Sequence, residues 1–310
     1  QIKDMGNGAA DRKLGIISFN NEVKVYGDGS QDPQIITGDK LYDYDYLFEN
    51  GTKQGEARMK HTIQESQEKL QSKLMSLEET GPTALGPAVL TSIAMAAEGA
   101  PGSQVVICTD GLANIGLGAF DEAKTESEIA KVDEFYEKVG QFAKEKGLTI
   151  NIVSIIGDEC NLDSLSRLAE MTGGNVERVD PVSLTTNFAN ILAKPIIASN
   201  VAVKVKLHKG LQFRNEAEER LSQDKTLLVR ELGNVTETCE ITFEYTLKKI
   251  SDLAKMADVD VAALKCFPFQ TQITFKALDG SKCIRIITEQ QQISNDREEL
   301  ERKADFNLLG

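Results

Sequence analysis

The sequence lacks any Cys-x-x-Cys pair and has only two histidines, His61 and His208. Its five cysteines are scattered over the chain, so no zinc-binding spacing can be assembled, and we exclude structural zinc. An odd number of cysteines, with Cys108 inside the apolar run 105–109, indicates reduced thiols. We therefore expect an intracellular, cytoplasmic protein.

Long apolar runs and an excess of basic residues are also missing. The longest apolar runs, such as residues 148–156, are interrupted by polar residues and fall short of the roughly 20 needed to cross a bilayer. The 35 Lys and Arg stand against 48 Asp and Glu, which gives a formal net charge of −13. Because this field repels phosphates, the sequence argues against nucleic-acid partners, and it contains no membrane span.

The usual nucleotide-binding motifs are not present either. There is no Gly-x-x-x-x-Gly-Lys-Ser/Thr loop, and Gly116-Leu-Gly118 lacks the third glycine of a dinucleotide fingerprint. No Asp-x-Asp pair follows an expected strand, and both histidines occur in patterns typical of surface or boundary residues. The sequence therefore predicts a protein that is not an enzyme.

What is present is a chain of 310 residues, long enough for two domains. Up to about residue 195, β-branched runs alternate with helix-period stretches, which predicts an α/β domain with a doubly wound, mostly parallel sheet. Residues 14–19 and 22–26 indicate a hairpin that places an antiparallel strand at a sheet edge. Further strands are expected at 105–109, 149–156 and 176–179, and helices at 57–79, 88–98, 125–146, 162–171 and 182–192.

Residues 27–55 are rich in Gly, Asp and Tyr and indicate a long surface excursion. Within it, residues 39–46 are acidic and carry tyrosines, so they are either a loop that docks a partner or a solvated insertion. On the expected helix 125–146, the apolar residues from Ile129 to Phe142 should face inward.

A second domain, residues 196–310, is predicted where the apolar period changes from 3.6 to 2. Alternating segments predict an antiparallel β-sandwich, with a short helical insertion at 250–264 and the start of a charged helix at 295–307. The expected strands are 201–207, 226–230, 238–247, 269–278 and 283–288.

Two oxygen ligands stand out as candidates for a hard cation such as Mg²⁺. Asp110 follows the expected strand 105–109, and the carboxyl ends of strands are where open α/β sheets hold their sites. Thr83 lies in the loop Gly81-Pro-Thr-Ala-Leu85 before a helix. The alternatives are that Asp110-Gly111 is a helix-entry turn and that Thr83 caps the helix that follows it.

Four segments occur in this order: Leu14-Gly-Ile-Ile-Ser-Phe19, Gly81-Pro-Thr-Ala-Leu85, Val105-Val-Ile-Cys-Thr-Asp-Gly111 and Leu168-Ala-Glu-Met-Thr-Gly-Gly174. Together they resemble a von Willebrand factor A domain over about residues 1–195. In that family, a metal-ion-dependent adhesion site combines an Asp-x-Ser-x-Ser loop, a threonine in a second loop and an aspartate after the fourth strand. Thr83 and Asp110 match the second and third elements, and the resemblance implies Mg²⁺ as cofactor.

The Asp-x-Ser-x-Ser element and the family's first strand have no counterpart in this sequence. That strand is central in the family's sheet, and its loss would leave two neighbouring strands with unpaired backbone groups. We therefore expect an incomplete metal site in this chain. We also expect that an upstream segment or another chain completes the sheet.

The segments Phe269-Gln-Thr-Gln-Ile-Thr-Phe275 and Cys283-Ile-Arg-Ile-Ile-Thr288, placed after an A-type domain, resemble the β-sandwich of COPII inner-coat subunits and of circularly permuted Ras-like proteins. This resemblance implies a non-enzymatic protein–protein interaction scaffold in membrane trafficking or in an assembly with a small GTPase. A partner's acidic side chain would complete the metal site. The alternative is a Mg²⁺-dependent phosphoryl-transfer or nucleotide-hydrolysing enzyme that uses Asp110.

Overall fold

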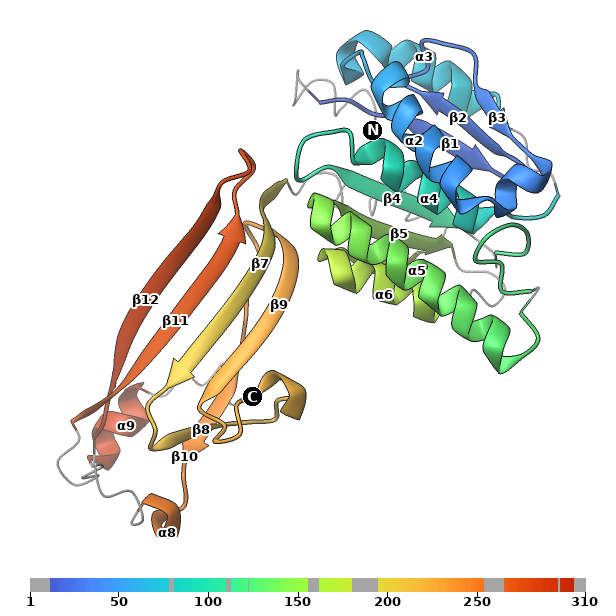
Figure 1. Cartoon of the computed structure of the whole chain (residues 1–310). Helices are drawn as coiled ribbons and strands as arrows, with labels where there is room; N and C mark the ends of the chain where they lie inside the picture. Colours follow the sequence, from blue (N-terminus) through green and yellow to red (C-terminus); the bar gives the residue numbers. More distant parts are fainter. Residues whose placement is uncertain are drawn as a thin grey trace. The chain divides into compact units, whose positions relative to one another are not determined.

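The chain forms two compact units (Figure 1). The computed structural model describes residues 12–77, 81–109, 113–121, 123–155, 162–179, 195–253, 265–294 and 296–303. The first unit consists of Gln1–Asn200 with Leu232–Thr238 and Lys276–Ser281. The second consists of Val201–Glu231, Cys239–Phe275 and Lys282–Gly310. A boundary between folding domains at residue 195 stays a prediction.

Two three-stranded sheets make up the β-structure of the first unit's described N-terminal part, and they confirm the predicted α/β class. One is antiparallel, in the order β1 (Ile16–Phe19), β2 (Val23–Gly27) and β3 (Gln34–Ile36). The other is parallel, in the order β4 (Gln104–Thr109), β5 (Thr149–Ile155) and β6 (Val176–Val179). The hairpin β1–β2 forms as predicted, but β2 is not an edge strand because β3 pairs with its far side.

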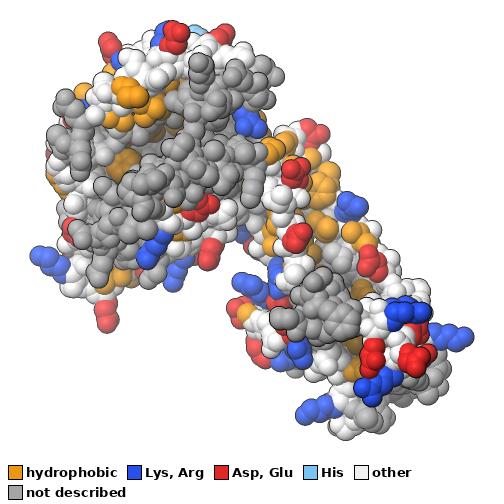
Figure 2. Space-filling model, turned by 180° about the vertical axis from the view of Figure 1, so that it is seen from behind, with side chains coloured by type: hydrophobic (Ala, Val, Ile, Leu, Met, Phe, Trp, Pro, Cys, Tyr) orange, Lys and Arg blue, Asp and Glu red, His pale blue; other side chains and the backbone are white. Residues whose placement is uncertain are grey.

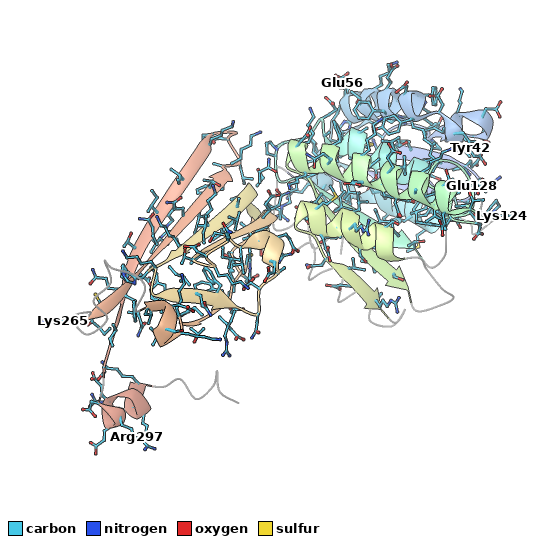
Figure 3. The ribbon with its side chains drawn as sticks, turned by 60° about the horizontal axis from the view of Figure 1, so that its bottom comes forward. Tyr42, Glu56, Lys124, Glu128, Lys265 and Arg297 are labelled. Atoms are coloured by element: carbon cyan, nitrogen blue, oxygen red, sulfur yellow. The ribbon has the colours of Figure 1, made fainter. Side chains whose placement is uncertain are left out.

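Capping residues in the sequence fix where two of the helices begin. Thr62 and Thr125 each form a capping box with a glutamate three residues on, because the hydroxyl and the carboxylate satisfy backbone N–H groups that the first turn leaves free. Figure 3 places Lys124 and Glu128 together at the start of α5, where the Lys124 N–H donates to the Glu128 carboxylate. The main helices are α2 (Tyr44–Arg58), α3 (Ile63–Met75), α4 (Leu85–Ala96), α5 (Glu126–Lys146) and α6 (Leu162–Thr172).

Residues 27–55 are not the predicted surface excursion. They contain β3, the 3₁₀ helix η1 (Gly38–Tyr42) and most of α2. Residues 39–46 form η1 and the start of α2, and Leu41 is buried in the core, so they are not a solvated insertion. Asp39, Tyr42, Asp43 and Asp45 are exposed, and a docking role for them stays a prediction. The predicted helix at 57–79 is also wrong at its start, because α2 runs to Arg58 and a new helix begins at Ile63.

The core of the first unit lies around α4, which is buried along nearly its whole length. Val23 and Val25 from the first sheet belong to the same hydrophobic cluster as Ile107 and Ile150 from the second. The cluster also takes up Val132, Tyr136 and Val139 of α5, as predicted, whereas Ile129 is 46% exposed and does not face inward.

Asn234 bonds to the parallel sheet of the first unit, where the later segments join that unit. Its buried amide donates to the backbone oxygen of Gly147 at 3.0 Å and to the Thr149 hydroxyl at 2.8 Å. Gly173, with φ of +72°, passes so close to the Asn234 backbone that a Cβ would collide with it. The Asn234 amide therefore satisfies hydrogen-bond acceptors at the amino end of β5.

The described residues after 195 form a four-stranded sheet in the order β12-β11-β7-β9 and a two-stranded antiparallel sheet β10-β8. The change to β-structure is as predicted, with two differences. The strand expected at 238–247 is shortened to four residues, and the pattern missed β8. The elements are β7 (Ile196–Leu207), β8 (Leu211–Arg214), β9 (Leu227–Thr236), β10 (Glu244–Leu247), α8 (Ile250–Leu253), β11 (Cys266–Lys276), β12 (Lys282–Gln292) and α9 (Arg297–Lys303).

Several predictions fall outside the described residues. They are the helix at 182–192, most of the insertion at 250–264, Cys160 and the candidate ligand Asp110.

Candidate functional site

The predicted metal-site residue Thr83 lies in the loop that leads into α4. Its backbone N–H donates to the side-chain oxygen of Asn114, and its backbone oxygen accepts from the Asn114 N–H at 3.1 Å. The next N–H, of Ala84, donates to the backbone oxygen of Asn20 at 2.8 Å. Asn20 directly follows β1, and Asn114 follows β4. The Thr83 loop therefore ties together the carboxyl ends of these two strands.

The Thr83 hydroxyl does not cap α4. The N-cap position belongs to Ala84, which has no side-chain oxygen to offer. Thr83 is half-buried, and among the described residues its hydroxyl makes no hydrogen bond.

Residues 113–121 hold this rim in place. The Leu117 N–H donates to the backbone oxygen of Leu41 at 3.0 Å, and the Phe120 N–H donates to Ala113 at 2.8 Å. The hydroxyl of the buried Tyr136 donates to the backbone oxygen of Gly118 at 3.3 Å. Helix α5 and helix η1 both hold the loop 113–121. Because both helices pack in the core, the core determines how this loop lies against Thr83.

The described part of the rim does not by itself make a magnesium site. Mg²⁺ favours carboxylate oxygens in octahedral geometry, whereas the described groups that bond to the Thr83 loop are the side chain and N–H of Asn114 and the backbone oxygen of Asn20. Among the described residues, no group of three or more His, Cys, Asp or Glu is placed to hold a metal ion. Asp110 lies outside the described residues, and a metal role for Thr83 and Asp110 stays a proposal.

Sequence reasoning missed the two asparagines that build this rim. Both lie in loops that were predicted to follow strands. Neither loop contains a sequence motif from which the hydrogen-bond partner of its asparagine could be predicted. A local signal exists only for Asn20, which directly follows an apolar strand; its side chain accepts from the Glu22 N–H, while its backbone oxygen accepts from the Ala84 N–H.

The described histidines and Cys108 have structural roles. His61 precedes α3 rather than lying within a helix, and its Nδ1 is 2.8 Å from the carboxylate of the buried Asp28. His208 Nδ1 accepts from the Gly210 N–H at 3.1 Å. Burial raises the pKa of the Cys108 thiol to about 12, so it stays protonated and unreactive at neutral pH. None of the three is placed as a catalytic base or nucleophile.

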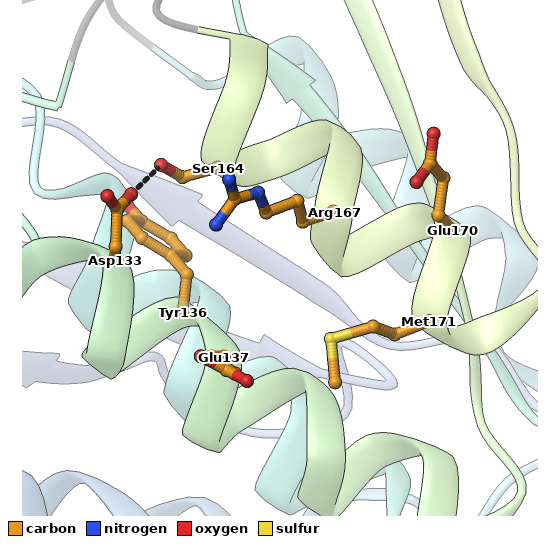
Figure 4. A pocket seen from close by; sticks show the side chains of 7 residues that line it. All are labelled: Asp133, Tyr136, Glu137, Ser164, Arg167, Glu170 and Met171. Carbon is orange, nitrogen blue, oxygen red and sulfur yellow. Dashed lines mark hydrogen bonds between the residues drawn. The ribbon is translucent and has the colours of Figure 1, made fainter. Parts of the chain in front are cut away.

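A small hollow of about 160 Å³ lies between α5 and α6 (Figure 4). The Ser164 hydroxyl donates to Asp133 at 2.6 Å and so joins the two helices. Among the lining residues that the structure describes, none is a histidine or lysine that could activate Ser164. Its lining residues are Asp133, Tyr136, Glu137, Ser164, Arg167, Glu170 and Met171.

Comparison with known proteins places the fold in a family. The Sec23/Sec24 trunk domain matches residues 2–194. The chain belongs to this trunk domain family. Human Sec24c, a COPII-coat protein, superposes with a TM-score of 0.59 at 11% identity, over 96% of this chain and 40% of its own. A von Willebrand factor type A protein from Catenulispora acidiphila superposes with a TM-score of 0.50 at 15% identity, over 92% of this chain and 58% of its own.

One curated protein is similar to this chain over both the trunk domain and the segments that follow it. The chain is 31% identical over 302 residues to Circularly permutated Ras protein 1 of Dictyostelium discoideum, which covers 96% of this chain. The chain spans about a third of that relative, 34% of its length. Both resemblances seen in the sequence, to an A-type domain and to a COPII-like module of circularly permuted Ras-like proteins, are confirmed.

No helix in the described part of the chain combines the length and the apolar character needed to span a bilayer.

Proposed function

We propose that this chain is a non-enzymatic, cytoplasmic protein–protein interaction scaffold of a coat-like trafficking assembly that works with a small GTPase. The observation that carries the proposal is the trunk-domain match over residues 2–194. The similarity to a relative whose name contains Ras supports the link to a small GTPase. The α/β sheet and the following β-sandwich occur in the order that a COPII-coat protein also contains, since Sec24c covers nearly the whole chain.

The chemistry of the described residues supports a scaffold over an enzyme. The His61 ring bonds to Asp28, the His208 ring accepts from the Gly210 N–H, and the Cys108 thiol stays protonated, so none of these three described groups is placed as a proton-transfer partner. Contacts with partners are then expected from loops, helix faces and strand edges, as in other interaction modules.

We further propose that Thr83 and Asp110 contribute two ligands to a Mg²⁺ ion that an acidic side chain of the partner completes. The bond between Asn114 and Thr83 supports this, because it draws the loop after β4 toward the Thr83 hydroxyl. When bound, the metal would supply a positive charge that bridges two acidic surfaces. The alternative, a Mg²⁺-dependent phosphoryl-transfer or nucleotide-hydrolysing enzyme built on Asp110, rests on that one carboxylate.

The deciding experiment measures binding and hydrolysis side by side. The part of the Dictyostelium relative that this chain does not span would be purified, loaded with GDP or a non-hydrolysable GTP analogue, and titrated against the chain by calorimetry. We expect micromolar binding that depends on the nucleotide, and no phosphate release from GTP or ATP by the chain alone. Steady phosphate release that Asp110→Asn abolishes would establish the enzyme instead.

The metal proposal has a separate test. Mg²⁺ would be titrated into the complex, and Thr83→Val, which keeps the side-chain shape but removes the hydroxyl, would be compared with Thr242→Val at an exposed threonine outside the named elements. We expect Mg²⁺ to strengthen partner binding several-fold in the chain and in Thr242→Val, but not in Thr83→Val. Equal effects in all three proteins would remove Thr83 from the site.

A further inference from the structure

The four-stranded sheet of the second unit has a packed face and an open face. On β7, Val203, Val205 and Leu207 are buried. Lys204 and Lys206 alternate with them and are exposed. Because successive side chains of a strand point to opposite sides, the two lysines lie on the side away from the buried residues. We call that side the open face.

Strand β11, next to β7 in this sheet, alternates in the same way (Figure 1). Phe267 is buried, and the ring of Phe269 packs against Tyr245 of β10 with the ring centroids 5.1 Å apart. The even-numbered residues of β11 therefore lie on the open face. One of them, Thr274, donates its hydroxyl to the backbone oxygen of Ala202 on β7 at 3.4 Å.

The turn between β11 and β12 fixes which residues of β12 join the open face. Across that turn, the Ala277 N–H donates to the Ser281 oxygen at 2.9 Å. Counting back along both strands places Ile284 opposite Thr274. Residues that lie opposite each other on neighbouring strands share a face, so Ile284 and, two residues further on, Ile286 lie on the open face.

The open face is basic on β7, β11 and β12, although the chain has 48 acidic and 35 basic residues. In these three described strands, the residues of this face include Lys204, Lys206 and Lys282 but no aspartate or glutamate. No ion pair is described for these three lysines. On β9 the exposed Glu231 lies on the same side, so the basic area is confined to the other three strands.

Two isoleucines lie among these lysines. Ile284 is 58% exposed and Ile286 is 55% exposed, whereas the solvated face of an antiparallel sheet is normally polar. Lys282 precedes Ile284 by two residues on β12. Neighbouring strands lie about 4.7–4.9 Å apart, so the lysines of β7 lie about 10 Å from β12 at the backbone. The open face therefore has an apolar part with positive charge on two sides.

A line of hydrogen-bonding side chains crosses the same face. The Gln272 amide donates to the Gln270 side-chain oxygen at 2.8 Å, and the Gln270 amide donates to the Thr288 hydroxyl at 3.4 Å. A primary amide has two hydrogens and a hydroxyl has one, so Gln272 and Thr288 each keep a donor beyond these bonds. Carboxylate and backbone carbonyl oxygens are the groups that such donors bind.

We propose that the open face, through Lys204, Lys206, Lys282, Ile284 and Ile286, binds an acidic segment of a partner protein that also carries apolar residues. The apolar residues of the segment cover the isoleucines, and its carboxylates lie against the lysines. The inference rests on the scaffold function and specifies a contact that is separate from the metal ligands proposed at Thr83 and Asp110.

A protein segment fits this face better than an anionic membrane surface does. Segments that insert into the membrane interface use Trp, Phe and Leu, whereas the exposed large apolar residues on the described open face of β11 and β12 are isoleucines. A formal net charge of −13 also repels an extended anionic surface. A short segment meets mainly the local lysines, because salt screens exposed charges over about 8 Å at physiological ionic strength.

The test uses the full 310-residue chain and a fluorescent peptide, Gly-Asp-Glu-Leu-Asp-Ile-Glu-Leu-Asp-Glu-Gly. Its control has Asn and Gln in place of every Asp and Glu. Fluorescence anisotropy is measured in EDTA, so that no metal ion contributes. We expect micromolar binding of the acidic peptide, weaker by about tenfold or more in the control peptide. Binding should also weaken by about tenfold between about 50 mM and about 500 mM salt.

A pair of lysine variants tests the charges. Lys204→Gln with Lys206→Gln is compared with Lys69→Gln with Lys131→Gln, two exposed lysines on α3 and α5. Both double variants change the net charge equally. We expect the first to weaken peptide binding by about fivefold or more and the second to leave it unchanged.

A second pair tests the apolar part. Ile284→Thr with Ile286→Thr keeps the branched side chains that strands favour but removes apolar surface. The control is Ile35→Thr on β3, where the side chain is 49% exposed. We expect the first to weaken peptide binding by about fivefold and the control to leave it unchanged. Circular dichroism checks that each variant is folded, and the comparison of the two peptides on the unaltered chain needs no variant.

Other outcomes overturn the proposal. Equal binding of the uncharged peptide would remove the lysines from recognition, and equal weakening by both lysine pairs would reduce it to net charge. If phosphatidylserine–phosphatidylcholine vesicles displace the peptide and need Lys204 and Lys206, the ligand is a membrane surface. If the acidic peptide binds but the GTPase-bearing partner does not, the proposed function fails and this inference stands. If the partner binds and the peptide does not, this inference alone fails.

Discussion

At the scale of single residues, Asp28 shows how a charged side chain becomes part of the framework. Its carboxylate is only 1% exposed and accepts from the N–H groups of Ser30, Lys60 and His61 and from the His61 ring. Burial raises the pKa of Asp28, but these hydrogen bonds outweigh it and hold that pKa well below its ordinary value. The carboxylate thus fastens the end of β2 to the turn between α2 and α3.

This arrangement predicts an acid-sensitive contribution to stability. The pKa of Asp28 is lower in the folded than in the unfolded chain, so its contribution is complete above the unfolded value of about 4 and is lost as the pH falls further. We expect Asp28→Asn to lower the free energy of unfolding at pH 7 by about 2–3 kcal/mol. Urea unfolding between pH 7 and pH 3 measures it.

The control is Asp39→Asn, at an exposed aspartate in the first turn of η1. It should change the free energy of unfolding at neutral pH by less than about 0.5 kcal/mol. An Asp28→Asn chain that loses stability below pH 4 as steeply as the unaltered chain would contradict this role for Asp28.

At the scale of elements, the contact between α2 and α4 is set by glycines. A Cβ built on Gly51 would lie 2.6 Å from the backbone oxygen of Thr91, and one on Gly55 would lie 2.6 Å from that of Met95. Such backbone positions cannot give way, so only glycine permits this close approach. The same glycines made α2 look like a loop in the sequence.

Gly51→Ala is therefore expected to destabilise the protein, although alanine normally favours a helix by about 0.5–1 kcal/mol over glycine. We expect a loss of about 1–3 kcal/mol from overpacking, measured by thermal or urea unfolding. Gly140→Ala on α5 is the matched control. Its Cβ would meet the ends of the flexible side chains Met171 and Leu168, so it should be close to neutral. Equal losses in both variants would refute the distinction.

At the scale of the whole molecule, acidic residues outnumber basic residues. On the face drawn in Figure 2, neither sign is gathered in one place. The formal net charge is −13, and on the face drawn in Figure 2 acidic and basic side chains alternate over the described surface. The view shows no continuous basic stripe of the kind that follows a phosphate backbone.

We therefore expect the chain to leave a short duplex DNA unretarded in a gel-shift assay at physiological ionic strength. Lowering the salt should not produce a shift, because the net field remains repulsive. A cationic protein of similar mass serves as the positive control. Retardation that grows as salt is reduced would mean that a hidden basic surface outweighs the net charge.

Much of the fold followed from local pattern alone. The apolar run at 105–109 predicted β4, the apolar period of residues 125–146 predicted α5, and Gly147, with φ of +71°, ended that helix before the predicted strand β5. These features depend on residues close in sequence, so a linear reading reached them. The change of the apolar period from 3.6 to 2 near residue 195 predicted the antiparallel sheets for the same reason.

Tertiary structure decided what depends on partners distant in sequence. Pattern could not reveal that α2, with its glycines, is buried against α4, that Asn20 and Asn114 meet at Thr83, or that Leu74 stays 42% exposed on an amphipathic helix. The apolar period shows only that one face of a helix or strand favours burial. Three-dimensional packing determines which other element covers that face. For that reason the composition and periodicity of this chain dictated its class, while the site at the ends of β1 and β4 exists only once the two sheets share a core.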